Sequence, residues 1–505
     1  MKKNLLLLVG LAFMCSAYAQ EVQDALRYSL SEIQGTARYR ALSGAFGALG
    51  GDMSAVSSNP AGSAVFVSSQ ASFSLSSLNI TNDTKFFNGV NSNSNSEFDI
   101  HQAGAAFVFA NNNSNSPWRK FTLGIAYDKL NNFNTNWFAN GVNTNSVDNY
   151  FLNYAQGLRL DEISAFPGES IADAYADIGS VFGYGHQQAF LGYESYILEP
   201  ETGDDANSVY FSNIAPGDFN QEYNYAATGY NGKFTFNFAT QYEDNLYLGL
   251  NLNSHFVNYE RSTYFFEGNS NEASLIQEVG FENNLYTVGS GFSFQLGGIL
   301  KLTPELRMGL SYDSPTWLSL EEETTQYIAT VRNEGGSAIT QVINPNVVNL
   351  FPKYRLQTPG KITGSFAYIF KDKGLISFDY SHKDFSNIKF KPTSDMYFTS
   401  LNNQMGNTLK SASTYRVGGE YRYKQFSFRG GYRFEESPYK DKTTIGDLTG
   451  YSLGLGYNFG NTKLDLTYDS FNRETQYQFF NTGLTDSVSI DSKNSNITLS
   501  LSFNL

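Results

Sequence analysis

The chain has 505 residues, a net charge of −14 and 16% charged side chains, while 16% of its residues are aromatic, chiefly 42 Phe and 34 Tyr. The acidic balance excludes a general nucleic-acid-binding role, which requires a basic surface. Many aromatic and few charged residues are typical of a membrane β-barrel, whose wall is apolar outside and polar inside.

The first residues have the pattern of a secretory leader. Met1–Ala19 combines two lysines, an apolar core and a small-x-small cleavage site at Ala17-Tyr18-Ala19, so the mature chain is expected to start at Gln20. The single cysteine, Cys15, lies in this leader behind Met14, which does not suit a lipoprotein site. No later stretch has 18 consecutive apolar residues, so an exported soluble protein or an outer-membrane barrel remains.

A compact helical segment is predicted to precede the strands. Gln20–Ile33 places apolar residues on one side of a possible helix. Gly, Ala and Ser then dominate, with helical turns expected at Arg38–Leu49 and from Asp52, a good N-cap residue. Asn59-Pro60 is expected to end the second turn, because the proline ring disfavours α geometry in the residue before it.

From Phe66 onward, apolar and polar residues alternate with the period of a β-strand. The clearest case is Ile497–Leu505, with Ile, Leu or Phe at every odd position and Thr, Ser or Asn between them. We expect about 14 antiparallel strands, an even number as in closed bacterial barrels, near residues 66–80, 97–110, 118–134, 221–241, 245–262, 281–298, 305–325, 356–371, 374–392, 411–423, 425–437, 449–460, 462–479 and 493–505.

The connections alternate between short turns and long loops, which is how outer-membrane barrels differ from soluble sandwiches. Short turns are expected at residues 243–245, 371–374, 423–425 and 460–462. Long loops are expected at Thr81–Glu97, Thr135–Asn220, Gln326–Arg355 and Thr393–Lys410. The fold class is therefore an all-β transmembrane barrel with a small N-terminal helical plug.

The segment before the strands resembles the N-terminal hatch of the long-chain fatty acid and hydrophobic compound transporter family of Gram-negative outer membranes. The similar positions are the Ala/Gly-rich stretch Ala41–Gly51, then Asp52, then Asn59-Pro60-Ala61 with Gly62. Later stretches are similar to the family's barrel strands: Thr303–Pro315, Tyr415–Tyr423 and Phe428–Tyr432.

The resemblance implies a signal peptide (residues 1–19), a hatch (20–65) and a barrel (66–505) with a helical extracellular loop (135–220). It also implies passive passage of hydrophobic molecules through an apolar lumen pocket. A lateral exit is implied at a kink of the third strand, within Phe121–Phe133, with Asn131-Asn132 as the kink position.

Three groups of residues are candidates for contact with a ligand or with the plug. The hatch group is Phe46, Leu49, Met53 and Val56, and the alternative for it is packing against the barrel wall. The loop group recurs at helical spacing and forms either a capture site or mutual packing: Phe151, Tyr154, Leu158, Ile171, Tyr175, Ile178 and Phe182. The lumen polar group comprises Arg307, Arg416, Glu420, Arg429 and Arg433, with Asp313, Asp379, Arg422, Asp465 and Asp469 also placed inward.

The lumen polar group either orients a ligand head group or forms ion pairs that hold the hatch, and we favour ion pairs because enclosed charges need partners. His101, His186, His255 and His382 show no metal-ligand spacing, and no nucleophile elbow occurs in the context of a hydrolase. We therefore expect neither an enzyme nor a cofactor nor a metal.

The expected partners are hydrophobic small molecules, outer-membrane lipid and lipopolysaccharide, without nucleic acid, and the expected state is a monomer. Two alternatives remain. One is a barrel that serves as a docking component of a protein secretion system, and the other is a porin for polar solutes. An apolar pocket beside the hatch favours transport, whereas a broad outer surface formed by the loops favours docking.

Overall fold

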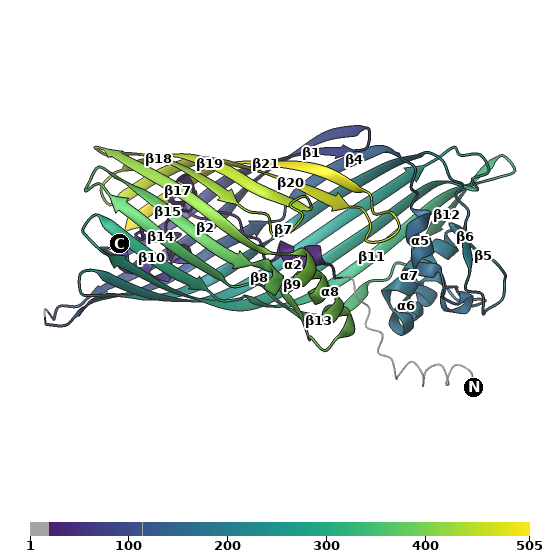
Figure 1. Cartoon of the computed structure of the whole chain (residues 1–505), viewed down its shortest axis with the longest axis horizontal. Coiled ribbons are helices and arrows are strands. Elements are labelled where there is room, and N and C mark those ends of the chain that lie inside the picture. The colour runs from purple at the N-terminus through teal and green to yellow at the C-terminus, as the bar shows by residue number, and fades with distance from the viewer. Residues whose placement is uncertain (1–19, 114) are drawn as a thin grey trace.

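The computed structural model describes residues 20–113 and 115–505, so the predicted leader lies outside the described residues. The strands form one closed antiparallel barrel of 14 strands (Figure 1), and β1 pairs with β21 to close it. The strand segments in chain order are β1 (Gln70–Phe86), β2 (Gly89–Ala110), β3 (Trp118–Asn132), β4 (Thr135–Asn143), β7 (Phe219–Tyr242), β8 (Leu246–Gly268), β9 (Ile276–Lys301), β10 (Leu306–Asp313), β11 (Trp317–Glu334), β12 (Ser337–Ile343), β13 (Asn349–Gln357), β14 (Lys361–Ile369), β15 (Gly374–Asp384), β16 (Lys389–Lys391), β17 (Ser411–Tyr423), β18 (Phe426–Glu435), β19 (Ile445–Asn458), β20 (Thr462–Gln478) and β21 (Ser487–Asn504).

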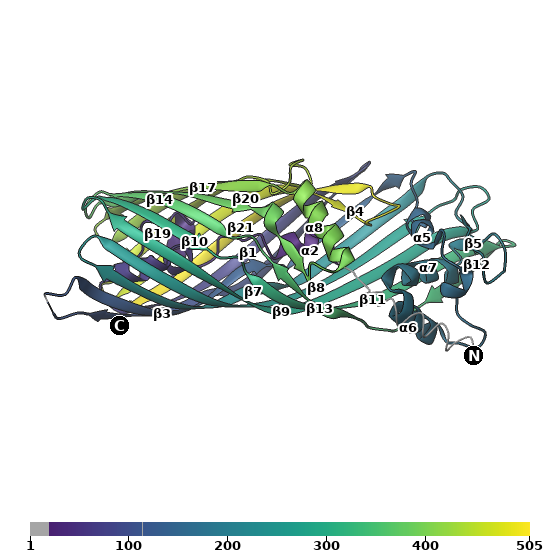
Figure 2. The same ribbon diagram turned by 60° about the horizontal axis from the view of Figure 1, so that its bottom comes forward.

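The helices lie inside the barrel or at one end of it (Figures 1 and 2). The hatch, defined here as residues 20–65, contains α2 (Val22–Arg27), α3 (Ala37–Ala41), α4 (Ala55–Ser58) and the 3-10 helix η1 (Pro60–Val65). The loop between β4 and β7 contains α5 (Asp148–Ala155), η2 (Leu160–Glu162), α6 (Ile171–Phe182), α7 (Tyr184–Glu194), β5 (Leu198–Pro200) and β6 (Tyr210–Ser212). Between β15 and β17 lie η3 (Phe385–Asn387) and α8 (Met396–Thr408).

The alternation predicted for the wall is confirmed in β21. Ile497 is 54% exposed on the outer face, whereas its neighbour Thr498 is 0% exposed on the inner face. Apolar side chains therefore face outward, where lipid surrounds a transmembrane barrel, and polar ones face the lumen. Within residues 20–113 and 115–505, no helix combines the length and the apolar character that crossing a membrane requires.

Some predicted boundaries were wrong for identifiable physical reasons. The helix predicted over Gln20–Ile33 ends at Arg27, because Ser29 Oγ bonds back to Ala25 O at 2.7 Å and Leu30 O accepts from the Asn131 side chain at 3.0 Å. The next residues run extended along β3, where Glu32 N donates to Leu130 O at 3.3 Å.

The predicted long loops at Thr81–Glu97 and Gln326–Arg355 are mostly strand instead. β1 and β2 continue to a tight turn at Phe87-Asn88, and β11 and β12 meet at Gly335-Gly336, both glycines having positive φ. The Asn-, Ser- and Thr-rich sequence of the first of these segments lacks one apolar face, so hydrophobic patterning missed its strands. The predicted loop Thr135–Asn220 begins with nine residues of strand β4, and Thr393–Lys410 contains helix α8.

Candidate functional site

Glycines in the wall give the hatch room to pack against the strands. A Cβ on Gly249 would lie 2.3 Å from Pro60 C, one on Gly309 would lie 2.2 Å from Gly47 O, and one on Gly454 would lie 2.4 Å from Ala41 Cβ. Because real Cβ atoms do not approach this closely, each of these wall positions excludes any larger residue while the hatch is in place.

Asn59 and Pro60 join the hatch to the wall as the sequence predicted. Asn59 is extended, with φ −146° and ψ 113°, and it ends α4. Its side-chain amide donates to Gly47 O at 2.7 Å and to Gly298 O at 3.1 Å, and its Oδ1 accepts from Ala61 N at 3.1 Å. The chain then forms η1 rather than a strand, so the first strand begins at Gln70 and not at Phe66.

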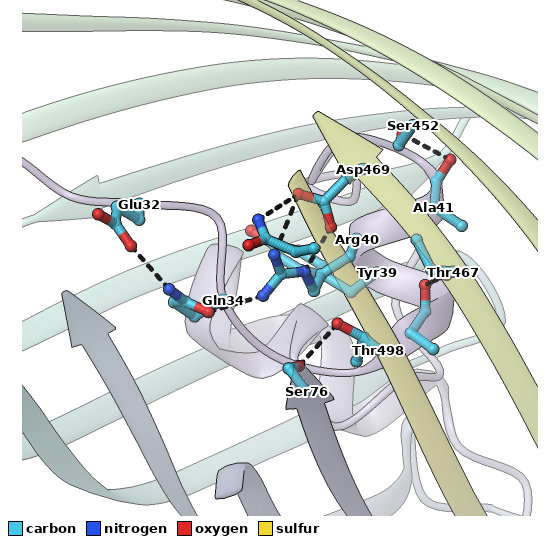
Figure 3. Close-up of polar contacts among 12 residues, drawn as sticks. Glu32, Gln34, Tyr39, Arg40, Ala41, Ser76, Ser452, Thr467, Asp469 and Thr498 are labelled. Atoms are coloured by element: carbon cyan, nitrogen blue, oxygen red, sulfur yellow. Dashed lines mark hydrogen bonds and ion pairs between the residues drawn. The ribbon is translucent and has the colours of Figure 1, made fainter. Parts of the chain in front are cut away.

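Ion pairs and hydrogen bonds connect the hatch to the wall around its whole circumference. Arg40 is 1% exposed and pairs with Asp469 of β20 at 2.8 Å, and its Nη1 donates to Gln34 Oε1 at 2.7 Å (Figure 3). On another side, the Asp379 carboxylate of β15 accepts from Phe46 N and Gly47 N, both at 3.0 Å. The hatch is thus held from several strands at once.

Among the predicted lumen polar residues, Glu420 and Arg307 contact the hatch directly. Glu420 pairs with Arg38 of the hatch at 3.0 Å and with Arg429 at 2.7 Å, and Arg307 Nη1 donates to Leu49 O at 2.9 Å. Arg433 lies 3.4 Å from Glu435 and Arg416 lies 3.9 Å from the same carboxylate. These residues form ion pairs with each other, with the wall and with the hatch, and whether they also orient a ligand head group stays a prediction.

The predicted apolar residues of the hatch are all buried. Phe46 and Leu49 pack in one cluster with Leu42 and Tyr39, whereas Met53 packs against the wall near Phe66. Val56 is 1% exposed, and its carbonyl accepts from the Asn251 side chain at 2.9 Å. None of the four lines either internal cavity described below, and ligand contact by them stays a prediction.

A large cavity, here called the vestibule, lies between the hatch N-terminus, the loop helices and α8, and its volume is about 760 Å³. Its aromatic lining is Tyr150, Tyr154, Phe182, Tyr184, Tyr223, Phe265, Phe281, Tyr397, Tyr439, Tyr477, Phe479 and Phe480. Its size falls within the range of pockets that enclose drug-sized ligands. Amide and hydroxyl groups, including Gln326 and Thr263, stand between the rings.

The loop residues predicted as a capture site divide into two groups. Tyr154 and Phe182 line the vestibule. Phe151, Tyr175 and Ile178 are buried in the cluster that holds the loop helices to the upper wall, and Leu158 and Ile171 pack against that cluster. Sequence reasoning missed the contributions of α8 and of the segment Tyr477–Phe480, whose Tyr-Gln-Phe-Phe composition was the one available signal.

A second cavity, here called the lumen cavity, lies beside the hatch and has a volume of about 180 Å³. Its lining is polar and charged rather than apolar, which differs from the pocket that the resemblance implied. Lys361 pairs with Asp313 at 2.7 Å, and Lys383 Nζ donates to Ser29 O. Lys233 is 5% exposed and also faces this cavity. A polar group that enters the lumen cavity would therefore meet charged side chains.

The third strand is interrupted at the position where the resemblance implied a kink. β3 ends at Asn132, β4 begins at Thr135, and the register against β7 shifts between Lys129 and Asn131. The β2–β3 ladder stops at the pair Gln102–Asp128. Beyond that point side chains join the two strands: Lys129 pairs with Asp99, and Asn132 Nδ2 donates to Glu97 Oε2 at 2.8 Å. Leu130 lines the lumen cavity beside this break.

Known proteins of similar sequence or fold share this architecture. Residues 227–505 match the model of a family described as outer membrane protein transport protein (OMPP1/FadL/TodX). The structure of a Pseudomonas aeruginosa FadL homologue has 12% identity and a TM-score of 0.54, over 94% of this chain and 99% of that chain. The Pseudomonas putida toluene transporter TodX has 12% identity and a TM-score of 0.52, over 94% and 99% of the two chains. No curated protein matches by sequence.

Proposed function

The chain belongs to the outer membrane protein transport protein family (OMPP1/FadL/TodX), and on that premise we propose that it carries small hydrophobic or amphipathic molecules passively across the outer membrane. Its relatives of similar fold include a toluene transporter, which supports an apolar substrate. No energy source is needed, because such a solute moves down its own concentration gradient.

The vestibule is the observation that carries this proposal. It is a ligand-sized cavity lined by aromatic rings from the loop helices, the wall and α8. Apolar ligands gain free energy by leaving water for such a surface, at about 25 cal/mol per Å² of apolar area buried. A solute that reaches the loops would therefore bind here, against the N-terminal residues of the hatch.

Below the vestibule, the hatch and the lumen cavity direct the path toward the wall. The hatch fills the lumen through contacts with many strands, so it opposes straight passage. The lumen cavity reaches the break in β3, where side chains replace the backbone ladder to β2. We propose this break as the route by which the ligand leaves the barrel. We also propose a monomer whose apolar outer band contacts lipid and lipopolysaccharide.

Mass spectrometry of molecules that copurify with the barrel tests this function. Wild-type protein extracted from outer membranes should yield an amphipathic or apolar compound at about one per barrel, and Tyr154→Ala with Phe480→Ala should lower that yield because both rings line the vestibule. Phe211→Ala is the matched control, since that ring is 55% exposed outside the vestibule. Equal yields from all three proteins, or no bound compound, would argue against the vestibule as a transport site.

A further inference from the structure

Four cations lie together on the outer face of β13 and β16 and are here called the basic patch. Its members are Lys353, Arg355, Lys389 and Lys391. Arg355 pairs directly with Lys391 in the ladder, and Lys353 is two residues before Arg355, so these side chains share one face of the sheet. The residues between them on the same strands are at most 3% exposed and pack in the interior: Tyr354, Leu356 and Phe390. The basic patch therefore points away from the lumen.

The basic patch begins where the apolar band of the outer wall ends. Trp317 of β11 is 41% exposed and pairs with Gln357, which in turn pairs with Lys389. The next outward residues of β11 are polar, and the strand continues to the loop helices, where Gln326 Oε1 accepts from Tyr175 Oη at 2.7 Å. Aromatic rings gather at the edge of the hydrocarbon region of a membrane barrel. The four cations thus lie at the level of the lipid headgroups, on the side of the loop helices.

Most of the charge of the basic patch has no counter-ion in the chain. Lys353 has a carboxylate partner on β11 at 2.7 Å, whereas Lys391 Nζ donates to the neutral amide of Gln357 at 2.8 Å. Within residues 20–113 and 115–505, the side chains of Arg355 and Lys389 make no hydrogen bond or ion pair. Because like charges directly opposite each other destabilise a strand pair, Arg355 beside Lys391 calls for an anion from outside the chain.

The strand that carries two of these cations is held on both of its edges. β16 has only three residues and pairs with β13 on one edge. On the other edge α8 takes the place of a further strand, since Asn402 accepts from Phe390 N at 2.8 Å and donates to Phe390 O at 2.9 Å. The rings of Phe390 and Phe398 stack with their centroids 5.5 Å apart. Lys389 and Lys391 flank Phe390, so the fold presents both ammonium groups from a fixed backbone.

The basic patch contrasts with the rest of an acidic chain. The net charge is −14. On the outer faces of β7 and β8, beyond the apolar band, the exposed charged residues include Glu222 and Glu260, and among the described residues of these two strands no Lys or Arg is exposed. An anion at the headgroup level is therefore attracted to one side of the barrel and repelled from another.

We propose that the basic patch binds the phosphate groups of a lipopolysaccharide molecule in the outer leaflet, whose acyl chains then lie along the apolar band below Trp317. The Arg355 guanidinium matches a phosphate through two parallel hydrogen bonds, and the lysine ammonium groups add further positive charge. Basic clusters at the headgroup level of membrane proteins bind anionic lipids in this way. The inference requires the outer-membrane location of the family and does not depend on which solute the barrel carries.

Native mass spectrometry of the purified full chain in detergent, titrated with lipid A, tests the inference. Wild-type protein should bind diphosphoryl lipid A more tightly than lipid A from which both phosphates have been removed. Arg355→Gln with Lys391→Gln should weaken binding of the diphosphoryl form by about tenfold or more, as expected for lost charge-assisted hydrogen bonds, and should leave binding of the dephosphorylated form unchanged. Lys389→Gln, which keeps the pair of like charges intact, should weaken it by a smaller factor and tests the basic patch should the double variant fail to fold.

Lys371→Gln with Lys373→Gln is the matched control, because it removes the same charge from exposed residues of the turn between β14 and β15, at the other end of these strands. Each variant must migrate as a heat-modifiable barrel. Equal binding of diphosphoryl lipid A by wild type and by the patch variants would overturn the proposal, while transport by this barrel would still stand. Displacement of lipid A by an equal concentration of inorganic phosphate would instead identify a site for free phosphate and would overturn the lipid assignment.

Discussion

Replacing Gly249 by alanine should loosen the hatch without unfolding the barrel. Gly249 pairs with Gly297 across β8 and β9; Gly249 faces backbone atoms of Pro60 and Ala61, whereas Gly297 faces the side chains of Asn59 and Pro60. An alanine Cβ at position 249 would lie 2.3 Å from Pro60 C and 2.4 Å from Ala61 N. These are backbone atoms, so no side-chain rotation can relieve the overlap, and η1 must move as a unit.

The size of the effect follows from the contacts that this movement breaks. Ordinary contact begins near 3.4 Å, so η1 must shift by about 1.1 Å. That shift disrupts the bonds from Asn237 Nδ2 to Pro60 O at 2.9 Å and from Asn59 Nδ2 to Gly298 O at 3.1 Å. Two neutral hydrogen bonds contribute about 1–3 kcal/mol together, so the population of the displaced hatch should rise by about 5- to 150-fold.

Hydrogen exchange measured by mass spectrometry over residues 59–66 reports this population directly. We expect faster exchange there in Gly249→Ala, with unchanged protection in β8 and β9. Gly298→Ala is the matched control, because a Cβ at that neighbouring position meets its nearest atom at an ordinary 3.7 Å. If Gly249→Ala exchanges no faster than Gly298→Ala, the hatch is not fixed by close contact with the wall glycines.

Two further outcomes are expected. Protease added to intact cells should cut within residues 144–218 but not at the turn Tyr423–Gln425, and cleavage at that turn would invert the topology. Pro60→Ala should raise hatch mobility and change uptake of a labelled hydrophobic ligand while barrel yield stays constant; unchanged uptake and exchange in Asn59→Ala with Pro60→Ala would reduce this motif to a helix stop.

The barrel could be predicted because its wall obeys one local rule. Successive side chains, such as those of Ile497 and Thr498, face the lipid and the lumen in turn. This alternation can be read from the sequence of one strand without knowledge of its neighbours. This alternation is lost near the turn of the β1–β2 hairpin. Both faces of the hairpin are polar there, so its sequence resembles that of a loop. Asn59-Pro60 was also predictable, since the proline acts on the residue before it through local sterics.

The candidate site could be predicted only in part, because it depends on contacts between distant segments. Tyr154 and Phe182 reach the vestibule, but their helical neighbours Phe151 and Tyr175 turn toward the wall, and spacing alone does not distinguish these faces.

Transport into proteoliposomes tests the central claim most directly. Purified protein in vesicles that enclose a fatty-acid-binding serum albumin should accelerate the transfer of an externally added fluorescent amphipathic carboxylate to the lumen, compared with protein-free vesicles. Tyr154→Ala with Phe480→Ala should slow this transfer, because both rings line the vestibule, whereas Phe211→Ala should not. Transfer at the same rate in protein-free vesicles and in vesicles with the barrel would contradict passage of ligands through this plugged barrel.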